Sequence, residues 1–274
     1  MIYIELTIDL KELDPWRDII IAELAEQGFE SFVETKTGLL GYIQESLFKP
    51  DMIQSILLND VISSHAIKTI AEQNWNAEWE KNFDPVFVEN KLAIIAPFHE
   101  RPDGFREVIS IMPKMSFGTG HHQTTWLASK RLFDLDLENK DVLDMGTGTG
   151  ILAILAEKLG AASVFAPDID QWSYENAKEN TTLNNCHKIE VALGDDSLLA
   201  NKFFHIIIAN INKNILIQHF SVYSTSQNSG GILLISGFFE TDKEDLVREA
   251  SKHGFIFDSV YTKEGWALIQ FLKK

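Results

Sequence analysis

Beyond Lys140 the chain alternates short apolar segments with amphipathic ones, and this alternation limits its fold more than any other feature. "DVLDMG" is typical of a strand and "ILAILAEKLG" of a helix, because the apolar residues change from a continuous run to helical spacing. The same alternation continues through "SVFAPDID", "WSYENAKENTTLNN", "IEVALGD", "FHIIIANI", "ILIQHFSVYS", "GGILLISGF" and "DKEDLVREASKHG". Apolar strands separated by amphipathic helices form a parallel sheet that is covered on both faces. This half of the chain therefore predicts a doubly wound α/β fold.

The last two segments break the alternation. "FIFDSVYTKEG" and "WALIQFLK" are both typical of strands, and only a short turn separates them. Such a hairpin places the final strand antiparallel within an otherwise parallel sheet.

Residues 1–72 predict a second, smaller domain. Their segments follow the order strand, helix, strand, strand, helix, strand, with a hairpin turn at Thr37 and Gly38. This order is that of a ferredoxin-like split βαβ sandwich, so we expect a small α+β domain. No motif that carries chemistry is visible in it.

Residues 73–115 predict a linker helix and a connector between the two domains. Trp75 and Trp79 are four residues apart and would share one face of the helix. They could grip a substrate, but packing between domains is the favoured interpretation. "KLAIIAPF" and "REVISIMP" are predicted strands of the connector, and the third region, residues 116–274, follows them.

The composition excludes several classes of protein. A single cysteine, Cys186, allows no internal disulfide and no zinc motif, which is typical of a reducing compartment. No signal sequence opens the chain and no charge-free stretch is long enough to cross a bilayer, so we expect a cytoplasmic protein without membrane contact. A net charge of −16 argues against direct nucleic-acid binding. It suits a basic partner, or it serves solubility alone.

Two glycine-rich stretches contain the same Gly-Thr-Gly core: "SFGTGHHQTT" at 116–125 and "DMGTGTG" at 144–150. The second lies between a predicted strand and a predicted helix, where Gly146, Gly148 and Gly150 would let a ligand approach the backbone and the helix amides. Its G-x-G-x-G spacing differs from the G-x-G-x-x-G of dinucleotide sites. Asp144, two residues before the first glycine, favours a cationic or zwitterionic ligand.

Polar residues at the ends of two later predicted strands extend this candidate site. Asp168 follows the glycine loop by about 20 residues, the spacing at which an acidic side chain accepts hydrogen bonds from ribose hydroxyls. Asp170 stands where the next helix begins and is predicted to be its N-cap. Asn210 ends the fourth predicted strand of this half.

These features resemble the seven-stranded S-adenosylmethionine-dependent methyltransferases, whose fold is Rossmann-like. "SFGTGHHQTT", the glycine loop, the two-domain order and "ANI" after the fourth strand narrow the resemblance to the PrmA family, over the whole chain. That family methylates the eleventh protein of the large ribosomal subunit. The resemblance implies methyl transfer from S-adenosylmethionine to lysine side-chain and N-terminal amines of this basic protein, in which Asn210 could accept a hydrogen bond from the incoming amine. We expect a monomer. It places cofactor contacts on Thr125, Gly146, Asp168 and Asn210.

The resemblance also implies different roles for the two loops. The 144–150 loop would lie under the cofactor, and the 116–125 motif would fold over its methionine end, with Phe117 and His121 near the reacting amine. Gln123 stands where the family commonly has proline, and Pro167 where it commonly has glycine. Gln123 is expected to loosen the turn into the helix that holds Thr125.

Several alternatives remain open on the sequence alone. His121 or His122 could act as a general base, but adjacent histidines without a ligand cluster do not predict a metal site. Phe117 could stack on a ligand or belong to the core. The protein could instead methylate a small metabolite, or bind S-adenosylmethionine or a ribosomal partner without catalysis. The glycine spacing and the terminal hairpin disfavour a nicotinamide dehydrogenase.

Overall fold

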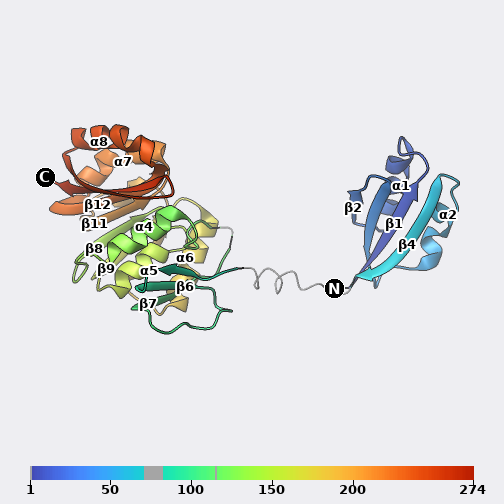
Figure 1. Ribbon diagram of the computed structural model, residues 1–274, viewed down its shortest axis with the longest axis horizontal. Helices are drawn as coiled ribbons and strands as arrows, with labels where there is room; N and C mark the ends of the chain where they lie inside the picture. The colour runs from blue at the N-terminus through green and yellow to red at the C-terminus, as the bar shows by residue number, and fades with distance from the viewer. Residues whose placement is uncertain (1, 71–82, 115) are drawn as a thin grey trace. The chain divides into compact units, whose positions relative to one another are not determined.

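The computed structural model describes residues 2–70, 83–114 and 116–274. The chain divides into two compact units, Met1–Asn82 and Phe83–Lys274, and Figure 1 draws each of them. The predicted helix with Trp75 and Trp79 lies outside the described residues. Residues 83–114, which the sequence assigned to a connector, are counted with the larger unit.

The smaller unit is a four-stranded antiparallel sheet covered by helices. Its strands are β1 (Tyr3–Leu10), β2 (Ser31–Glu34), β3 (Gly38–Gln44) and β4 (Ile62–Ile70), and its helices are α1 (Trp16–Glu26), the 3₁₀ helix η1 (Pro50–Ile53) and α2 (Gln54–Leu57). The sheet order is β2-β3-β1-β4. Every second residue of β1 is buried, because alternate side chains of a strand point to the same face. That face packs against Ile20 and Leu24 of α1 and Ile56 of α2.

The larger unit contains a seven-stranded sheet in the order β10-β9-β8-β11-β12-β14-β13. Its strands are β8 (Asp141–Met145), β9 (Ser163–Asp168), β10 (Ile189–Leu193), β11 (Phe204–Asn210), β12 (Gln227–Phe239), β13 (Phe255–Lys263) and β14 (Trp266–Lys273). The pairs among β8 to β12 are parallel, whereas β14 runs antiparallel to both β12 and β13. The terminal hairpin therefore inserts its last strand between β12 and β13.

Helices cover both faces of this sheet, as Figure 1 shows. They are α4 (Gln123–Leu132), α5 (Ile151–Lys158), α6 (Gln171–Leu183), α7 (Lys213–Thr225) and α8 (Lys243–Lys252). Val142 of β8 belongs to the core with α4 and α5, and its neighbour Leu143 belongs to the opposite core with α7 and α8. Both faces are apolar, so the strands read as continuous hydrophobic runs.

A second, three-stranded sheet precedes α4. It consists of β5 (Val86–Val88), β6 (Leu92–Ile95) and β7 (Glu107–Ser110), in that order. Val88, Ile94 and Ile109 join the core that contains α4 and α5. The small sheet therefore packs against the helices on one face of the seven-stranded sheet, and the 116–125 stretch, which follows β7 in the chain, includes the start of α4.

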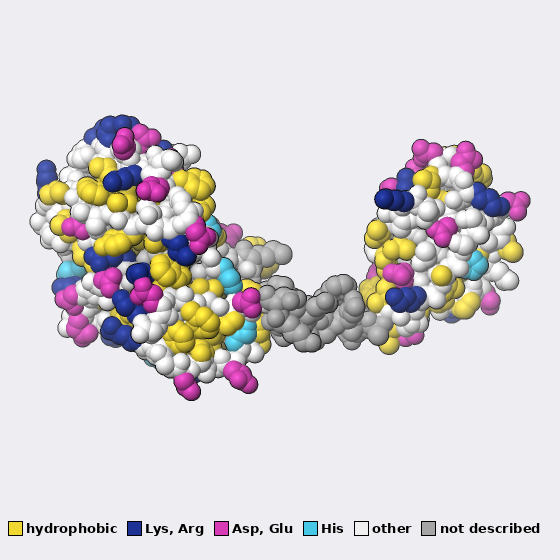
Figure 2. All heavy atoms as spheres, viewed as in Figure 1, with side chains coloured by type: hydrophobic (Ala, Val, Ile, Leu, Met, Phe, Trp, Pro, Cys, Tyr) yellow, Lys and Arg dark blue, Asp and Glu magenta, His cyan; other side chains and the backbone are white. Residues whose placement is uncertain are grey.

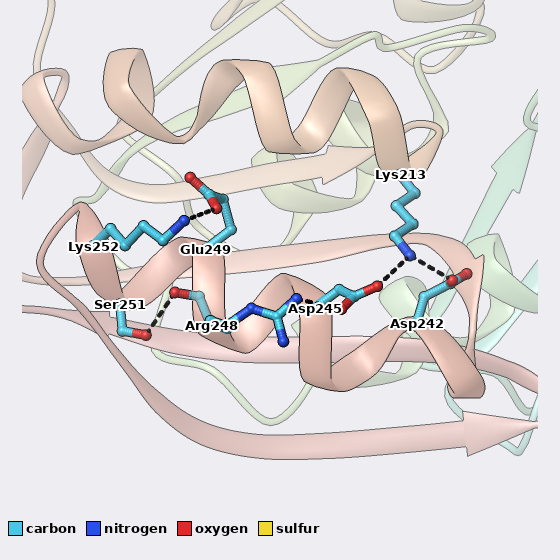
Figure 3. Close-up of polar contacts among 7 residues, drawn as sticks. All are labelled: Lys213, Asp242, Asp245, Arg248, Glu249, Ser251 and Lys252. Carbon is cyan, nitrogen blue, oxygen red and sulfur yellow. Dashed lines mark hydrogen bonds and ion pairs between the residues drawn. The ribbon is translucent and has the colours of Figure 1, made fainter.

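An ion-pair cluster joins the turns that follow β11 and β12, as Figure 3 shows. Lys213, the first residue of α7, lies 2.7 Å from Asp242 in the 3₁₀ helix η3 (Glu240–Asp242) and 3.0 Å from Asp245 in α8. The hydrogen bond that Lys213 donates to Asp242 is the main reason that the pKa of Lys213 is raised. The cluster ties together two loops at the carboxyl ends of neighbouring strands.

Charged side chains of both signs are interspersed on the face of each unit drawn in Figure 2. Among the described residues, no helix is long and apolar enough to cross a membrane.

Candidate active site

A cavity of about 580 Å³ opens at the carboxyl ends of the parallel strands, where open α/β sheets bind ligands. Its walls come from residues at or near the carboxyl ends of β8, β9, β10, β11 and β12, from α6 and α7, from the first residue of β14 and from the 116–125 motif. The lining residues are Phe117, His122, Thr124, Met145, Gly146, Gly148, Asp168, Ile169, Ser173, Asp195, Asn210, Ile211, Asn212, Ile215, His219, Gly237 and Trp266. The cavity therefore brings together residues that are separated by up to half of the chain.

The glycine loop needs glycine for backbone and steric reasons. Gly148 has a φ of +57°, a conformation that side chains with a Cβ rarely adopt. A Cβ there would lie 2.3 Å from the backbone oxygen of Phe117. A side chain added at Gly148 would therefore collide first with the other glycine-rich stretch.

The two glycine-rich stretches are bonded to each other. The Thr149 amide donates to the Phe117 oxygen at 2.9 Å, and the Thr149 hydroxyl donates to the Gly118 oxygen at 2.6 Å. A Cβ on Gly118 would lie 2.8 Å from that hydroxyl. The 116–125 motif is thus anchored on the 144–150 loop, and a change in one displaces the other.

Asp168 lies beside the glycine loop at the end of β9. Its Oδ2 accepts from the Gly148 amide at 2.8 Å, and its Oδ1 accepts from the Asp170 amide at 3.0 Å. A carboxylate has about four acceptor positions, so both oxygens can still accept from a diol. Asp170 accepts from the Ser173 amide at 2.8 Å, which confirms the prediction that it caps α6.

Pro167 fits its strand without disturbing this arrangement. Its carbonyl oxygen accepts from the Gly146 amide at 3.0 Å and from the Thr147 amide at 3.3 Å. The residue that lacks an amide hydrogen therefore still holds the start of the glycine loop through its acceptor.

Asp144 is buried beneath the loop and is not one of the residues that line the cavity. Its Oδ2 accepts from the Thr147 hydroxyl at 2.7 Å and from the Ala153 amide in α5 at 3.1 Å. Burial raises the pKa of this carboxyl to about 6, against the two hydrogen bonds, which lower it. Asp144 thus joins the loop to the helix, and any influence on a ligand passes through the loop. Gly150, the N-cap of α5, is likewise outside the lining.

Asn210 ends β11 and lines the cavity. Its Nδ2 donates to Oγ1 of the fully buried Thr125 at 3.4 Å. Its Oδ1 is buried and has no hydrogen-bond partner among the described residues. A buried acceptor without a partner costs about 1–3 kcal/mol, so this atom favours a ligand that brings a donor.

Aromatic rings form one wall of the cavity. The rings of Phe117 and His122 lie 5.2 Å apart, those of His122 and Trp266 lie 4.5 Å apart, and those of Trp266 and Phe239 lie 4.2 Å apart. Phe117 is 55% exposed, so the structure places it on the cavity and outside the core. Burial lowers the pKa of His122.

The adjacent histidines lie in different environments. His122 caps α4 by accepting from the Thr124 amide and also lines the cavity. His121 is outside the lining, with its Nε2 3.0 Å from the Asp84 oxygen and its ring 4.8 Å from that of Phe83. Among the residues that the structure describes, no group of three His, Cys, Asp or Glu could hold a metal ion.

Sequence reasoning missed Trp266, Asp195 and His219 as cavity residues. Asp195 had a detectable signal, because it follows a predicted strand as Asp168 does. The only sequence signal for Trp266 was its position directly after the hairpin turn. His219 lies within α7, and nothing in its local sequence sets it apart.

Gln123 does not leave the start of α4 loose. Its Nε2 donates at 2.7 Å to Glu264, in the turn between β13 and β14 that precedes Trp266. Arg131 at the other end of α4 donates to Gln270 of β14 at 2.8 Å. The expected loosening is therefore offset by side-chain contacts to the terminal hairpin.

Comparisons with known proteins agree with this geometry. The chain is 44% identical to the ribosomal protein L11 methyltransferase of Porphyromonas gingivalis over 260 residues, 93% of this chain and 90% of that protein. It is 41% identical to the protein of the same name from Bacteroides fragilis over 279 residues, 99% of this chain and 100% of that protein.

Among solved structures, a ribosomal protein L11 methylase from Lactobacillus delbrueckii is similar with a TM-score of 0.64 and 32% identity, covering 70% of this chain and 100% of that one. A Pyrococcus furiosus methyltransferase shares the fold, with a TM-score of 0.51 and 18% identity over 60% of this chain and 89% of that one. The family model described as ribosomal protein L11 methyltransferase (PrmA) matches residues 16–274. The chain thus belongs to the ribosomal protein L11 methyltransferase (PrmA) family.

Proposed function

We propose that this protein transfers methyl groups from S-adenosylmethionine to lysine side-chain and N-terminal amines of ribosomal protein L11. The observation that carries the proposal is the unpartnered Oδ1 of Asn210 in the wall of the cavity. An amine hydrogen is the donor that this acceptor lacks. Family membership supplies the class of reaction, and the cavity supplies the groups that could perform it.

The residues around the cavity fit the proposed cofactor. Gly146 and Gly148 leave the backbone of the loop open on the cavity side, and Asp168 keeps acceptor positions for a ribose diol. Thr125 fixes the amide of Asn210 through its hydroxyl oxygen. When bound, S-adenosylmethionine supplies an electrophilic methyl group on a positively charged sulfur.

The aromatic wall supports an amine substrate. A lysine that enters between Phe117, His122 and Trp266 leaves water, and desolvation lowers the pKa of its ammonium group. The proton passes to solvent, and the neutral nitrogen then has a lone pair for attack on the methyl carbon. Asn210 would orient the nitrogen by accepting one of its remaining hydrogens. Placing the reactants in line at short distance supplies much of the acceleration.

The smaller unit is proposed to bind the protein substrate. Its strand order β2-β3-β1-β4 and its helices between strands support a ferredoxin-like domain. The roles of His121 and Phe117 in catalysis, the monomeric state, the lack of nucleic-acid binding and the cytoplasmic location stay predictions.

The experiment incubates the full chain with radiolabelled S-adenosylmethionine and ribosomal proteins from a strain that lacks the enzyme. One band at the size of L11 should be labelled, and its intact mass should rise in steps of one methylene. Asn210→Ala should lower kcat/KM by about 10- to 100-fold, the cost of losing one buried hydrogen bond. Asn228→Ala makes the same chemical change in β12 outside the cavity and serves as the control. Absence of a labelled protein would refute the proposed substrate.

A further inference from the structure

Helix α6 and its C-cap residue Asn184 carry three asparagines at a spacing that the cavity does not explain. Asn176, Asn180 and Asn184 are each four residues apart, so they lie on the same side of the helix. All three are buried, with exposed fractions of 1%, 0% and 9%. Buried side-chain amides need hydrogen-bond partners, and those partners indicate the structural role of the three asparagines.

The second and third asparagines, Asn180 and Asn184, bind the backbone that leads from β7 toward the 116–125 motif. Asn184 accepts from the Ser110 amide at 2.9 Å and donates to the Ser110 oxygen at 2.6 Å. Asn180 accepts from the Met112 amide at 2.8 Å. Between them, the Ile111 amide donates to the Ile95 oxygen of β6 at 2.8 Å. Residues 110–112 are therefore held between a strand on one side and asparagine side chains on the other.

Asn180 alone among the three also reaches the glycine loop. Its Nδ2 donates to the Thr149 oxygen at 2.9 Å and to Asn176 Oδ1 at 2.9 Å. The amide of the same Thr149 donates to Phe117 of the other motif. The Asn180 side chain is thus hydrogen-bonded to Met112, which precedes the 116–125 stretch, and to Thr149, which belongs to the 144–150 loop.

We propose that Asn180 is a positioning residue that sets the register of the two glycine-rich stretches relative to each other. It touches neither the cavity lining nor the proposed reacting atoms, and it acts through Thr149 and Met112. Gly148, the neighbour of Thr149, bonds to Asp168 on the cavity side. A shift of Thr149 would therefore move the surface on which the cofactor is proposed to lie. The inference rests on the proposed function, because its consequence is read in cofactor binding.

Asn180→Ala and Asn184→Ala form a matched pair for the test. Both remove a buried amide, one within α6 and one at its C-cap, but only Asn180 contacts the glycine loop. The dissociation constant of S-adenosylhomocysteine is measured by calorimetry on each full-length variant, with urea unfolding in parallel. We expect affinity to fall about tenfold for Asn180→Ala, equivalent to about 1.4 kcal/mol, and less than about threefold for Asn184→Ala. Stability should fall in both.

Asn180→Asp keeps the acceptor for Met112 and removes the donors to Thr149 and Asn176, so it isolates the loop contact if the alanine variant does not fold. We expect it to weaken S-adenosylhomocysteine binding at least as much as alanine does. Equal affinities for the Asn180 and Asn184 variants, or unchanged affinity in Asn180→Asp, would overturn the positioning role. A wild-type protein that does not bind S-adenosylhomocysteine would instead refute the proposed function, so the two failures are distinguishable.

Discussion

The buried carboxyl of Asp144 should make the stability of this protein depend on pH in an unusual direction. Its pKa is raised to about 6 from an ordinary value of 3.8, because burial disfavours the charged form. The folded state therefore binds a proton between about pH 4 and 6 that the unfolded chain releases. By linkage, proton binding to Asp144 adds to the free energy of unfolding. This added stability is fully present below pH 3.8 and is lost as pH rises through about 6. Most carboxylates that gain partners on folding show the opposite trend.

The difference between 3.8 and about 6 corresponds to about 3 kcal/mol at about 1.36 kcal/mol per pKa unit. Asp144→Asn keeps an acceptor for Thr147 and Ala153 and has no charge to bury. The free energy of unfolding in urea is measured for both proteins from pH 4 to 7.5. We expect the wild type to lose up to about 3 kcal/mol relative to the variant over this range.

Asp141→Asn provides the control, because Asp141 begins the same strand and its side chain is 44% exposed. It removes one negative charge without relieving a buried carboxyl. A difference between wild type and Asp144→Asn that stays constant from pH 4 to 7.5 would refute the reasoning.

Three further predictions concern the cavity. Gly148→Ala should lower the free energy of unfolding by about 1–3 kcal/mol, because the residue has a φ of +57° and its Cβ would lie 2.3 Å from Phe117 O; an undiminished urea midpoint would contradict this. Trp266→Ala should raise KM for ribosomal protein L11 more than it raises the dissociation constant of S-adenosylhomocysteine, since the ring belongs to the aromatic wall. Steady-state kinetics measures the first quantity and calorimetry the second. Equal changes in both would place Trp266 with the cofactor. Asp168→Asn should weaken S-adenosylhomocysteine binding by about tenfold, as expected for the loss of a charge-assisted hydrogen bond. Calorimetry at constant ionic strength measures this affinity. An unchanged affinity would show that Asp168 does not bind the ribose.

Local patterns were enough to predict most of the secondary structure. The alternating apolar and amphipathic segments predicted β8 to β12 and their helices, since each depends on periodicity within about ten residues. Asp170 was predicted as an N-cap for the same reason, because capping is settled within three residues of the helix start.

Residues whose roles depend on tertiary packing were harder to assign. Asp144 was expected to influence the ligand, but the structure buries it between Thr147 and Ala153. Gly148 was expected to spare the ligand from a clash, but the nearest obstacle is Phe117, 31 positions away in sequence. The contact with Phe117 has no signature in the local pattern. The partners of Asp144 are only three and nine residues away, but its burial depends on how the sheet and helices pack.

The sequence by itself determined the α/β character, the glycine loop and the family resemblance, because these follow from spacing and residue type along the chain. Only the tertiary structure decided that the two Gly-Thr-Gly stretches are hydrogen-bonded to each other. It also decided that Asn180 bonds to Thr149 in one stretch and to Met112 ahead of the other. It also decided that His122 and Trp266, 144 positions apart, share one wall of the cavity. Hydrogen bonds and ring contacts act over a few ångströms in space, whatever the separation in sequence, so the fold has to bring such residues together before their chemistry can be assigned.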